Sequence, residues 1–358
     1  MSSNLHFGNL SVSIFGESHG NGIGVVIDGL PGGCEIDFDR ILDFMARRAP
    51  KKDGISTRRN EKDFPEIMSG YLNGKTTGTP LCAVIKNTDQ HSKDYGNIET
   101  VARPGHADYT GSVRYNNAND IRGGGHFSGR ITAPLVFAGA VCGQILEQKG
   151  IYSGAHILSI GNIYDNKFDS VNVTKEDLET VKTKDFPLIN SAVEQEMKDK
   201  VKAASDKLDS IGGRIECAVT GLPAGIGSPM FDGLENRISQ AVFGVPAVKG
   251  IEFGVGFDFA DMCGSEANDC FTTDGKTIKT VTNNNGGILG GISSGMPVIF
   301  TAAIKPTPSI AQPQQTVDYV KMENTVLEIK GRHDACIVPR AVPVIEAAAN
   351  IAVLSFLI

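Results

Sequence analysis

The most constraining segment of this chain is a glycine-rich run, RGGGHFSGR at residues 122–130, which leads directly into the apolar stretch from Ile131 to Leu146. Adjacent glycines let backbone N–H groups point the same way and approach an anion closely. The apolar stretch predicts a buried helix, with Pro134 tolerated in its first turn. A glycine loop before a helix N-terminus is a natural phosphate site. Taken alone, the segment favours a tight turn into a core helix over a phosphate site.

Glycine and charge narrow the class of protein. The chain has 42 glycines in 358 residues, well above the usual share of about 7%, and they fall in clusters that predict backbone-lined loops. A formal net charge of −7 argues against a nucleic-acid partner. The arginines nevertheless gather in motifs, which favours a small anionic ligand. Ordinary surface arginine is the alternative, above all for Arg58 and Arg59.

The seven cysteines are scattered without any Cys-x-x-Cys pair. Neither a zinc site nor a disulfide framework is therefore predicted, and no metal is expected. The N-terminus lacks a basic-then-apolar signal segment, and the apolar stretch Ala347 to Ile358 is too short to span a bilayer. We expect a reduced, cytoplasmic protein with no membrane partner.

Hydrophobic periodicity outlines one α+β domain covering residues 1–358. No repeat and no low-complexity linker divides the chain. The segment 165–210 is rich in Lys, Asp and Glu, and we interpret it as a solvated helical region without chemistry. There Ser191 and Glu194 predict a capping box, and Glu196 is placed to pair with Lys200. Strands are predicted at 10–15, 24–27, 81–86 and 296–303, and helices at 37–48, 131–146 and 341–357.

Four of the seven histidines lie in dense polar clusters. They are His19 in GESHG, His106 in RPGHAD, His126 in the glycine loop and His333 in GRHD. Histidine is the side chain best suited to exchange protons near neutral pH. Asp108 and Asp334 each lie close to one of these histidines and are candidates to orient it or to act as bases. For Asp108, a turn or cap role is at least as plausible.

Other motifs add a binding function and exclude several enzyme classes. Lys305-Pro-Thr-Pro-Ser309 follows a predicted strand, and a lysine with two hydroxyls there suits a phosphate or ribityl chain; a proline-fixed loop is the alternative. The chain has no phosphate-loop motif, dinucleotide fingerprint, metalloprotease helix motif or nucleophile elbow. The residues alone thus indicate an anion-binding enzyme with arginine clamps and histidine acid–base groups.

Six motifs in order resemble those of the chorismate synthase family. They are GESHG at 16–20, RPGHAD at 103–108, RGGGHFSGR at 122–130, GGILGGISSG at 286–295, KPTPS at 305–309 and GRHDAC at 331–336. The resemblance runs from near residue 8 to the C-terminus. It implies a single-domain β-α-β sandwich, assembled as a homotetramer. It also implies conversion of 5-enolpyruvylshikimate 3-phosphate to chorismate and phosphate, an anti 1,4-elimination that needs reduced FMN.

The same resemblance implies roles for individual residues. His19 would assist the departing phosphate, His106 would act near the flavin pyrimidine edge, and Asp334 would take part in proton transfer. The implied substrate contacts are Arg48, Arg130 and Arg340. The implied FMN contacts are His126, Phe127, Ser128, Pro246, Ala247, Gly290, Lys305, Pro306, Thr307, Pro308, Ser309 and Arg332.

This chain departs from the family pattern near residue 50. Members often carry three arginines before the proline, where this chain has Arg47-Arg48-Ala49-Pro50, and many have an arginine at the position of Gly54. The loop reads His126-Phe127 where many relatives have Arg-Ser. The changes near residue 50 weaken the expectation of NADPH binding, and the change at His126-Phe127 removes a fixed positive charge from the flavin loop. An NADPH-dependent flavin reductase using the same FMN pocket is the alternative function, and a non-catalytic anion-binding protein is a third.

Overall fold

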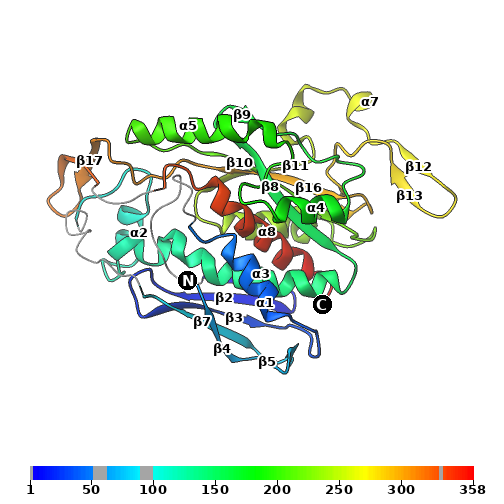
Figure 1. The fold of residues 1–358 in the computed structure, drawn as a ribbon, viewed down its shortest axis with the longest axis horizontal. Helices are drawn as coiled ribbons and strands as arrows, with labels where there is room; N and C mark the ends of the chain where they lie inside the picture. Colours follow the sequence, from blue (N-terminus) through cyan, green and yellow to red (C-terminus); the bar gives the residue numbers. More distant parts are fainter. Residues whose placement is uncertain (1–2, 51–62, 89–99, 330–333) are drawn as a thin grey trace.

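Two five-stranded antiparallel sheets enclose a layer of helices in the computed structural model, which describes residues 3–50, 63–88, 100–329 and 334–358 (Figure 1). The first sheet has the order β1-β2-β3-β7-β4, with β1 at Asn4–Phe7, β2 at Leu10–Gly16, β3 at Gly22–Asp28, β7 at Leu81–Lys86 and β4 at Pro65–Ser69. The second has the order β11-β16-β10-β8-β9, with β11 at Val248–Phe253, β16 at Val298–Ile304, β10 at Gly213–Thr220, β8 at Tyr152–Ile160 and β9 at Ile163–Tyr164.

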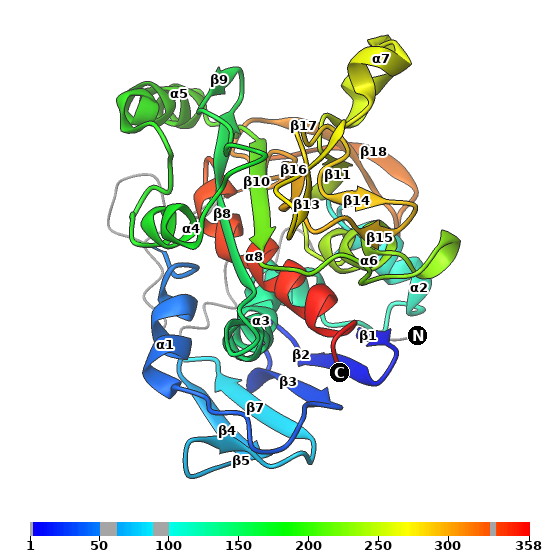
Figure 2. The same ribbon diagram turned by 90° about the vertical axis from the view of Figure 1, so that its right-hand side faces the viewer.

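The middle layer is built on helices α3 (Thr132–Glu147) and α8 (Val338–Leu354), which lie side by side (Figure 2). Helix α3 also contacts the first sheet, whereas α8 contacts β8 and β10 of the second. The two helices approach closely, because a Cβ atom added to Gly139 would lie 2.2 Å from Cβ of Ala347. The molecule is therefore an α+β sandwich of sheet, helices and sheet, as predicted.

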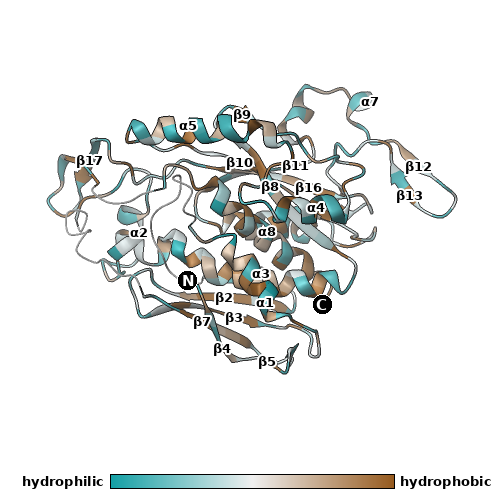
Figure 3. Ribbon diagram, in the orientation of Figure 1, coloured by the Kyte–Doolittle hydropathy of each residue, from teal (hydrophilic) through white to brown (hydrophobic). Residues whose placement is uncertain are grey.

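Apolar residues follow this layering (Figure 3). One helical stretch, Gly129–Glu147, is long and apolar enough to cross a membrane by length and composition alone, and 89% of its apolar window is buried inside the protein. It therefore has the burial of a core helix. Helices α1 (Phe38–Ala46) and α6 (Leu234–Phe243) complete the inner packing, and the charged helices α4 (Lys175–Lys182) and α5 (Glu194–Asp206) lie outside the second sheet.

The predicted strands and helices are confirmed within a few residues at their ends. The details at the start of α5 were wrong, however. A 3₁₀ turn, Ser191–Val193, precedes the helix, and the side chain of Asn190 accepts a hydrogen bond from the backbone N–H of Ala192. The observed ion pair joins Glu194 to Lys198, in place of the predicted pair of Glu196 and Lys200. Ser191 is the first residue of that turn, and the N-cap of α5 is Val193, whose side chain makes no capping hydrogen bond.

The capping box in this segment lies instead at the start of α4, where Thr174 and Asp177 exchange hydrogen bonds. The segment is also less fully solvated than predicted. Its Asp165 is buried and accepts backbone hydrogen bonds from Ile189 and Asn190. The charge-rich composition of the segment therefore gave no indication that Asp165 is buried and hydrogen-bonded to the backbone.

Candidate active site

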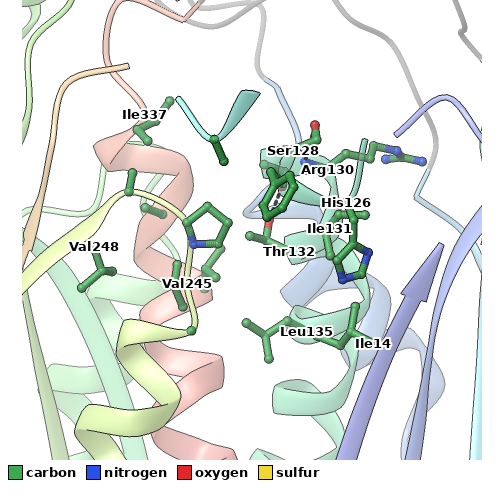
Figure 4. Close-up of a pocket in the computed structure, with 18 of the residues that line it drawn as sticks. Ile14, His126, Ser128, Arg130, Ile131, Thr132, Leu135, Val245, Val248 and Ile337 are labelled. Carbon is green, nitrogen blue, oxygen red and sulfur yellow. Dashed lines mark hydrogen bonds between the residues drawn. The ribbon is translucent and has the colours of Figure 1, made fainter. Parts of the chain in front are cut away.

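A cavity of about 940 Å³ opens where the N-terminal ends of α3 and α8 meet the loop between α6 and β11 (Figure 4). Single drug-sized ligands occupy pockets of roughly 300–1,000 Å³, so this volume suits a large ligand or two smaller ones. The predicted site residues that line it are His19, Arg48, His106, His126, Phe127, Ser128, Arg130, Pro246, Ala247, Lys305, Thr307, Pro308, Ser309, Asp334 and Arg340.

Three predicted site residues are not among the lining residues. Gly290 lies in the turn between β14 (Ile288–Leu289) and β15 (Ile292–Ser293), and Pro306 is exposed. Arg332 lies outside the described residues, as do His333, Gly54, Arg58 and Arg59. The structure therefore gives no test of the roles predicted for Arg332, and the flavin contacts of Gly290 and Pro306 stay predictions.

The glycine loop passes between two of the predicted histidines. Gly123, Gly124 and Gly125 have φ angles of 60°, 85° and 53°, a left-handed backbone that favours glycine. A Cβ on Gly123 would lie 2.1 Å from the ring of His19, and one on Gly124 would lie 3.3 Å from Nε2 of His106. The absence of side chains therefore lets both rings pack on the loop backbone.

His126 ties this loop to the segment that carries His19. Its Nδ1 donates to the carbonyl of Gly16 at 2.7 Å, and its Nε2 lies 2.5 Å from Oγ of Ser3. The backbone N–H of Ser18 also donates to the carbonyl of Gly125 at 3.1 Å. These bonds fix the position of His19 relative to the glycine loop.

His106 is held by a buried ion pair. Asp108, the first residue of helix α2 (Asp108–Arg114), accepts from Arg103 Nε and Nη2, each at 2.7 Å. His106 Nδ1 lies 2.7 Å from Asp108 Oδ1. Burial opposes the charge, but the hydrogen bonds from Arg103 and His106 hold the pKa of Asp108 well below its ordinary value. Arg103 Nη1 also donates to Oγ of Ser309 at 3.3 Å, so the cluster reaches the KPTPS segment.

The three predicted substrate arginines converge from three elements. Arg48 follows α1, Arg130 precedes α3, and Arg340 lies in the first turn of α8. Asp63 forms ion pairs with both Arg48 and Arg130. Arg340 donates from Nε to the carbonyl of Arg48 at 3.1 Å and from Nη1 to Asp334 Oδ2 at 2.5 Å.

This arginine cluster concentrates positive charge at one end of the cavity. Burial lowers the pKa of Arg48, Asp63 opposes that effect, and the charges of Arg340 and Arg130 lower the pKa further. Burial raises the pKa of Asp63, but the two arginines beside it hold that pKa below its ordinary value. Within the described part of the chain, these three guanidinium groups pair with two carboxylates, Asp63 and Asp334, and forked cationic donors of this kind suit a polyanion.

The opposite walls of the cavity are apolar. Figure 4 shows Ile14 and Leu135 on one side and Val245, Val248 and Ile337 on the other. Thr307 adds a buried hydroxyl oxygen that has no hydrogen-bond partner within the described ranges. Apolar walls with a few polar groups suit a flat aromatic ligand that carries heteroatoms. Among the described residues, no three His, Cys, Asp or Glu side chains form a group able to hold a metal ion.

Sequence reasoning missed several residues that shape this site. Asp63 is one, because it follows a polar loop and meets its arginines only through the fold. Asn87 is another, since it accepts from Arg130 Nε and donates to the carbonyls of Glu17 and Gly20. Gln240 and Lys249 line the cavity without any local motif. Of these residues that shape the site, Arg103 could have been found from the sequence, because it is the first residue of the RPGHAD motif.

Comparisons with known proteins agree with the motifs. Residues 10–358 match the family model of chorismate synthase. The chain is 46% identical to the chorismate synthase of Lachnoclostridium phytofermentans, covering 98% of this chain and 94% of that one. It is 45% identical to that of Dehalococcoides mccartyi, covering 94% and 91%. A crystal structure of chorismate synthase superposes with a TM-score of 0.77 at 29% identity, covering 98% and 92%. The chain therefore belongs to the chorismate synthase family, whose members are carbon–oxygen lyases that act on phosphates.

Proposed function

We propose that this protein converts 5-enolpyruvylshikimate 3-phosphate to chorismate and phosphate, the last step of the shikimate pathway, with reduced FMN bound in the same cavity. The observation that carries the proposal is the convergence of three arginines and three clustered histidines on one cavity in a chain of this family. The reaction removes phosphate and one ring hydrogen from the substrate and is redox-neutral overall.

The arginine cluster suits the substrate, which carries a phosphate and two carboxylates. Arg48, Arg130 and Arg340 present forked donors from three elements, so each is able to hold a different anionic group. Asp63 keeps two of the guanidinium groups oriented before any ligand arrives. Pre-oriented charges in a partly closed site stabilise the negative charge that develops on a departing phosphate.

The described residues also fit a flavin. The apolar walls match the two faces of an isoalloxazine ring, while Thr307, Lys305 and Ser309 offer polar groups for its ribityl phosphate. Lys305 has a pKa lowered by burial and by the nearby charge of Lys249, and a neighbouring anion would relieve that repulsion. When bound, reduced flavin supplies the electron density that the elimination requires.

Three residues are assigned to proton handling. His19, packed on the glycine loop, gives a proton to the departing phosphate. His106, with Nδ1 directed to Asp108, holds or moves a proton at Nε2. Asp334, fixed by Arg340, takes part in the proton transfer that accompanies loss of the ring hydrogen. Each side chain lines the cavity.

We propose in addition that residues 1–358 act as one catalytic domain in a cytoplasmic homotetramer. The family resemblance supports the assembly, and Phe231, Phe257 and Met322, which are 86%, 82% and 84% exposed, are of the aromatic and methionine types enriched at subunit interfaces. Light scattering of the purified protein tests this: a particle of one chain would contradict it.

An anaerobic assay tests the activity. Purified protein is mixed with 5-enolpyruvylshikimate 3-phosphate and dithionite-reduced FMN, and chorismate absorbance and released phosphate are followed. A second cuvette contains NADPH and oxidised FMN instead. Product only with chemically reduced flavin indicates a lyase that depends on an external reductant, and product in both adds an intrinsic reductase. No product in either contradicts the proposed function.

A further inference from the structure

The imidazole of His106 faces two groups that make opposite demands on the same nitrogen. Its Nδ1 lies 2.7 Å from the carboxylate oxygen Oδ1 of Asp108 and 3.0 Å from the guanidinium nitrogen Nη2 of Arg103. An ionised carboxylate only accepts hydrogen bonds, and a guanidinium only donates them. Nδ1 therefore either carries a proton and donates to Asp108, or lacks one and accepts from Arg103.

The surrounding contacts decide in favour of Asp108. Its carboxylate accepts from the backbone N–H of Arg103 at 3.0 Å, from Nε at 2.7 Å and from Nη2 at 2.7 Å. Arg103 Nη2 thus already has a stronger acceptor than the ring nitrogen. Asp108 is buried, and with its depressed pKa it stays ionised. The proton accordingly belongs on Nδ1 of neutral His106, which leaves the Nε2 lone pair on the side facing Gly124.

We propose that Asp108, oriented by Arg103, is a positioning residue that fixes the Nδ1-protonated tautomer of His106 and so leaves Nε2 ready to take up a proton. This inference rests on the proposed function, in which His106 handles a proton at Nε2. His106 lines the cavity, whereas Asp108 does not. Asp108 therefore acts through the histidine and not on a ligand. Ser309, which accepts from Arg103 Nη1, links the cluster to the segment 305–309.

The same carboxylate oxygen contacts both the ring of His106 and the guanidinium group of Arg103. When Nε2 gains a proton, His106 becomes a cation whose Nδ1 lies 3.0 Å from a guanidinium nitrogen. Asp108 contacts both cations and offsets their repulsion. Lys305 adds a third positive group close by, because its Nζ donates to the carbonyl of Gly105. Within the described part of the chain, Asp108 is the carboxylate that pairs with both Arg103 and His106.

Asp108→Asn provides the test. The asparagine keeps the size of the side chain but removes its charge, so Arg103 becomes the stronger partner of Nδ1 and the proton is expected on Nε2. Solid-state ¹⁵N NMR of protein labelled in histidine reports which ring nitrogen is protonated, and loss of one signal in H106Q assigns it. We expect an Nδ1-protonated ring in the wild type and in D108E, and an Nε2-protonated ring in D108N.

Kinetics provide the second readout. Misplacing a histidine tautomer by removing its carboxylate costs ~10²-fold or more in rate, so we expect kcat of D108N to fall by that factor with KM for the substrate little changed. Asp232→Asn is the matched control, because Asp232 pairs with Arg237 through two bonds of 2.6 Å and lies outside the cavity lining. It should alter neither the His106 signal nor kcat.

The outcomes separate this inference from the proposed function. A wild-type His106 that is protonated on Nε2, or a D108N protein that keeps both the Nδ1 proton and wild-type kcat, overturns the inference. If D108N does not fold, D108E decides, since a folded D108E with an Nε2-protonated ring also overturns it. Failure of the wild type to form chorismate would refute the proposed function, while the NMR result would still decide the positioning claim.

Discussion

Gly123→Ala is the sharpest perturbation of the site, because the new methyl group would meet the ring of His19. A Cβ at this position lies 2.1 Å from Nδ1 and Cε1 of His19, whereas ordinary van der Waals contact begins at 3.4 Å. Either the ring or the loop must move by about 1.3 Å. Misplacing a catalytic group by ~1 Å can cost on the order of 10²-fold in rate, so we expect kcat to fall by that factor.

The substitution also strains the backbone, and this effect needs its own control. Gly123 has φ of +60°, and a non-glycine residue in the left-handed region costs roughly 1–2 kcal/mol. Gly150 has φ of +76° with no atom within 4 Å of an added Cβ. Gly150→Ala therefore carries a similar backbone strain without the contact with His19.

The assay compares the two variants by chorismate formation and by thermal unfolding. G150A should lose about 1–2 kcal/mol of stability from backbone strain alone. G123A should lose that amount and a further ~1–3 kcal/mol from the overpacked methyl group, and only G123A should lose activity. Near-wild-type kcat in G123A would refute the argument that the glycine loop positions His19. Equal loss of activity in both variants would show that strain, and not displacement of His19, is responsible.

Three further predictions concern the buried ionic groups. His156→Leu should lower the free energy of unfolding by about 3–5 kcal/mol. The reason is that Asp165 and Glu216, which are bonded to the ring nitrogens at 3.1 and 3.0 Å, are left buried without a cation. Denaturation curves test this, and a loss of stability below ~1 kcal/mol would contradict it. Burial lowers the pKa of His156, but these carboxylates raise it above 6.5 overall. The stabilisation that the charged His156 ring gives to the folded protein is therefore complete below pH 6.5 and is lost as pH rises through the raised pKa. The melting temperatures of wild type and H156L should accordingly converge with rising pH, and divergence would argue against a charged ring. Arg48→Lys should raise KM for the substrate about tenfold, because lysine cannot reproduce the forked guanidinium group that reaches Asp63 and Thr132. An unchanged KM in initial-rate assays would show that Arg48 does not bind the substrate.

Local pattern was sufficient for the elements that obey one simple rule. The apolar run after residue 130 predicts α3 within one residue, and the stretch 81–86 coincides with β7. Both are buried segments whose composition leaves few alternatives. The start of α5 was harder, because Asn190 and Ser191 are both good capping residues and only the observed turn decides between them.

The convergence of the site was predictable only through the resemblance. His19, His106 and His126 are far apart in sequence, and nothing in their spacing places them on one glycine loop. Asp63 was not found at all, because its partners Arg48 and Arg130 are joined to it by the fold and not by a motif. Residues that orient other residues leave little trace in a sequence, since their effect depends on distances that only tertiary structure sets.

The close approach of Gly139 to Ala347 links the packing of α3 against α8 to the position of the helix ends that line the cavity. Thr132 at the start of α3 lies about 10 Å from the point where the two helices cross, at a helical rise of 1.5 Å per residue, and the first turn of α8 carries Arg340. A larger side chain at this crossing would push α3 and α8 apart and would move their N-terminal ends, which carry residues of the cavity. The spacing of α3 and α8 thus depends on Gly139 and Ala347, two small residues that are buried in the interior and do not line the cavity.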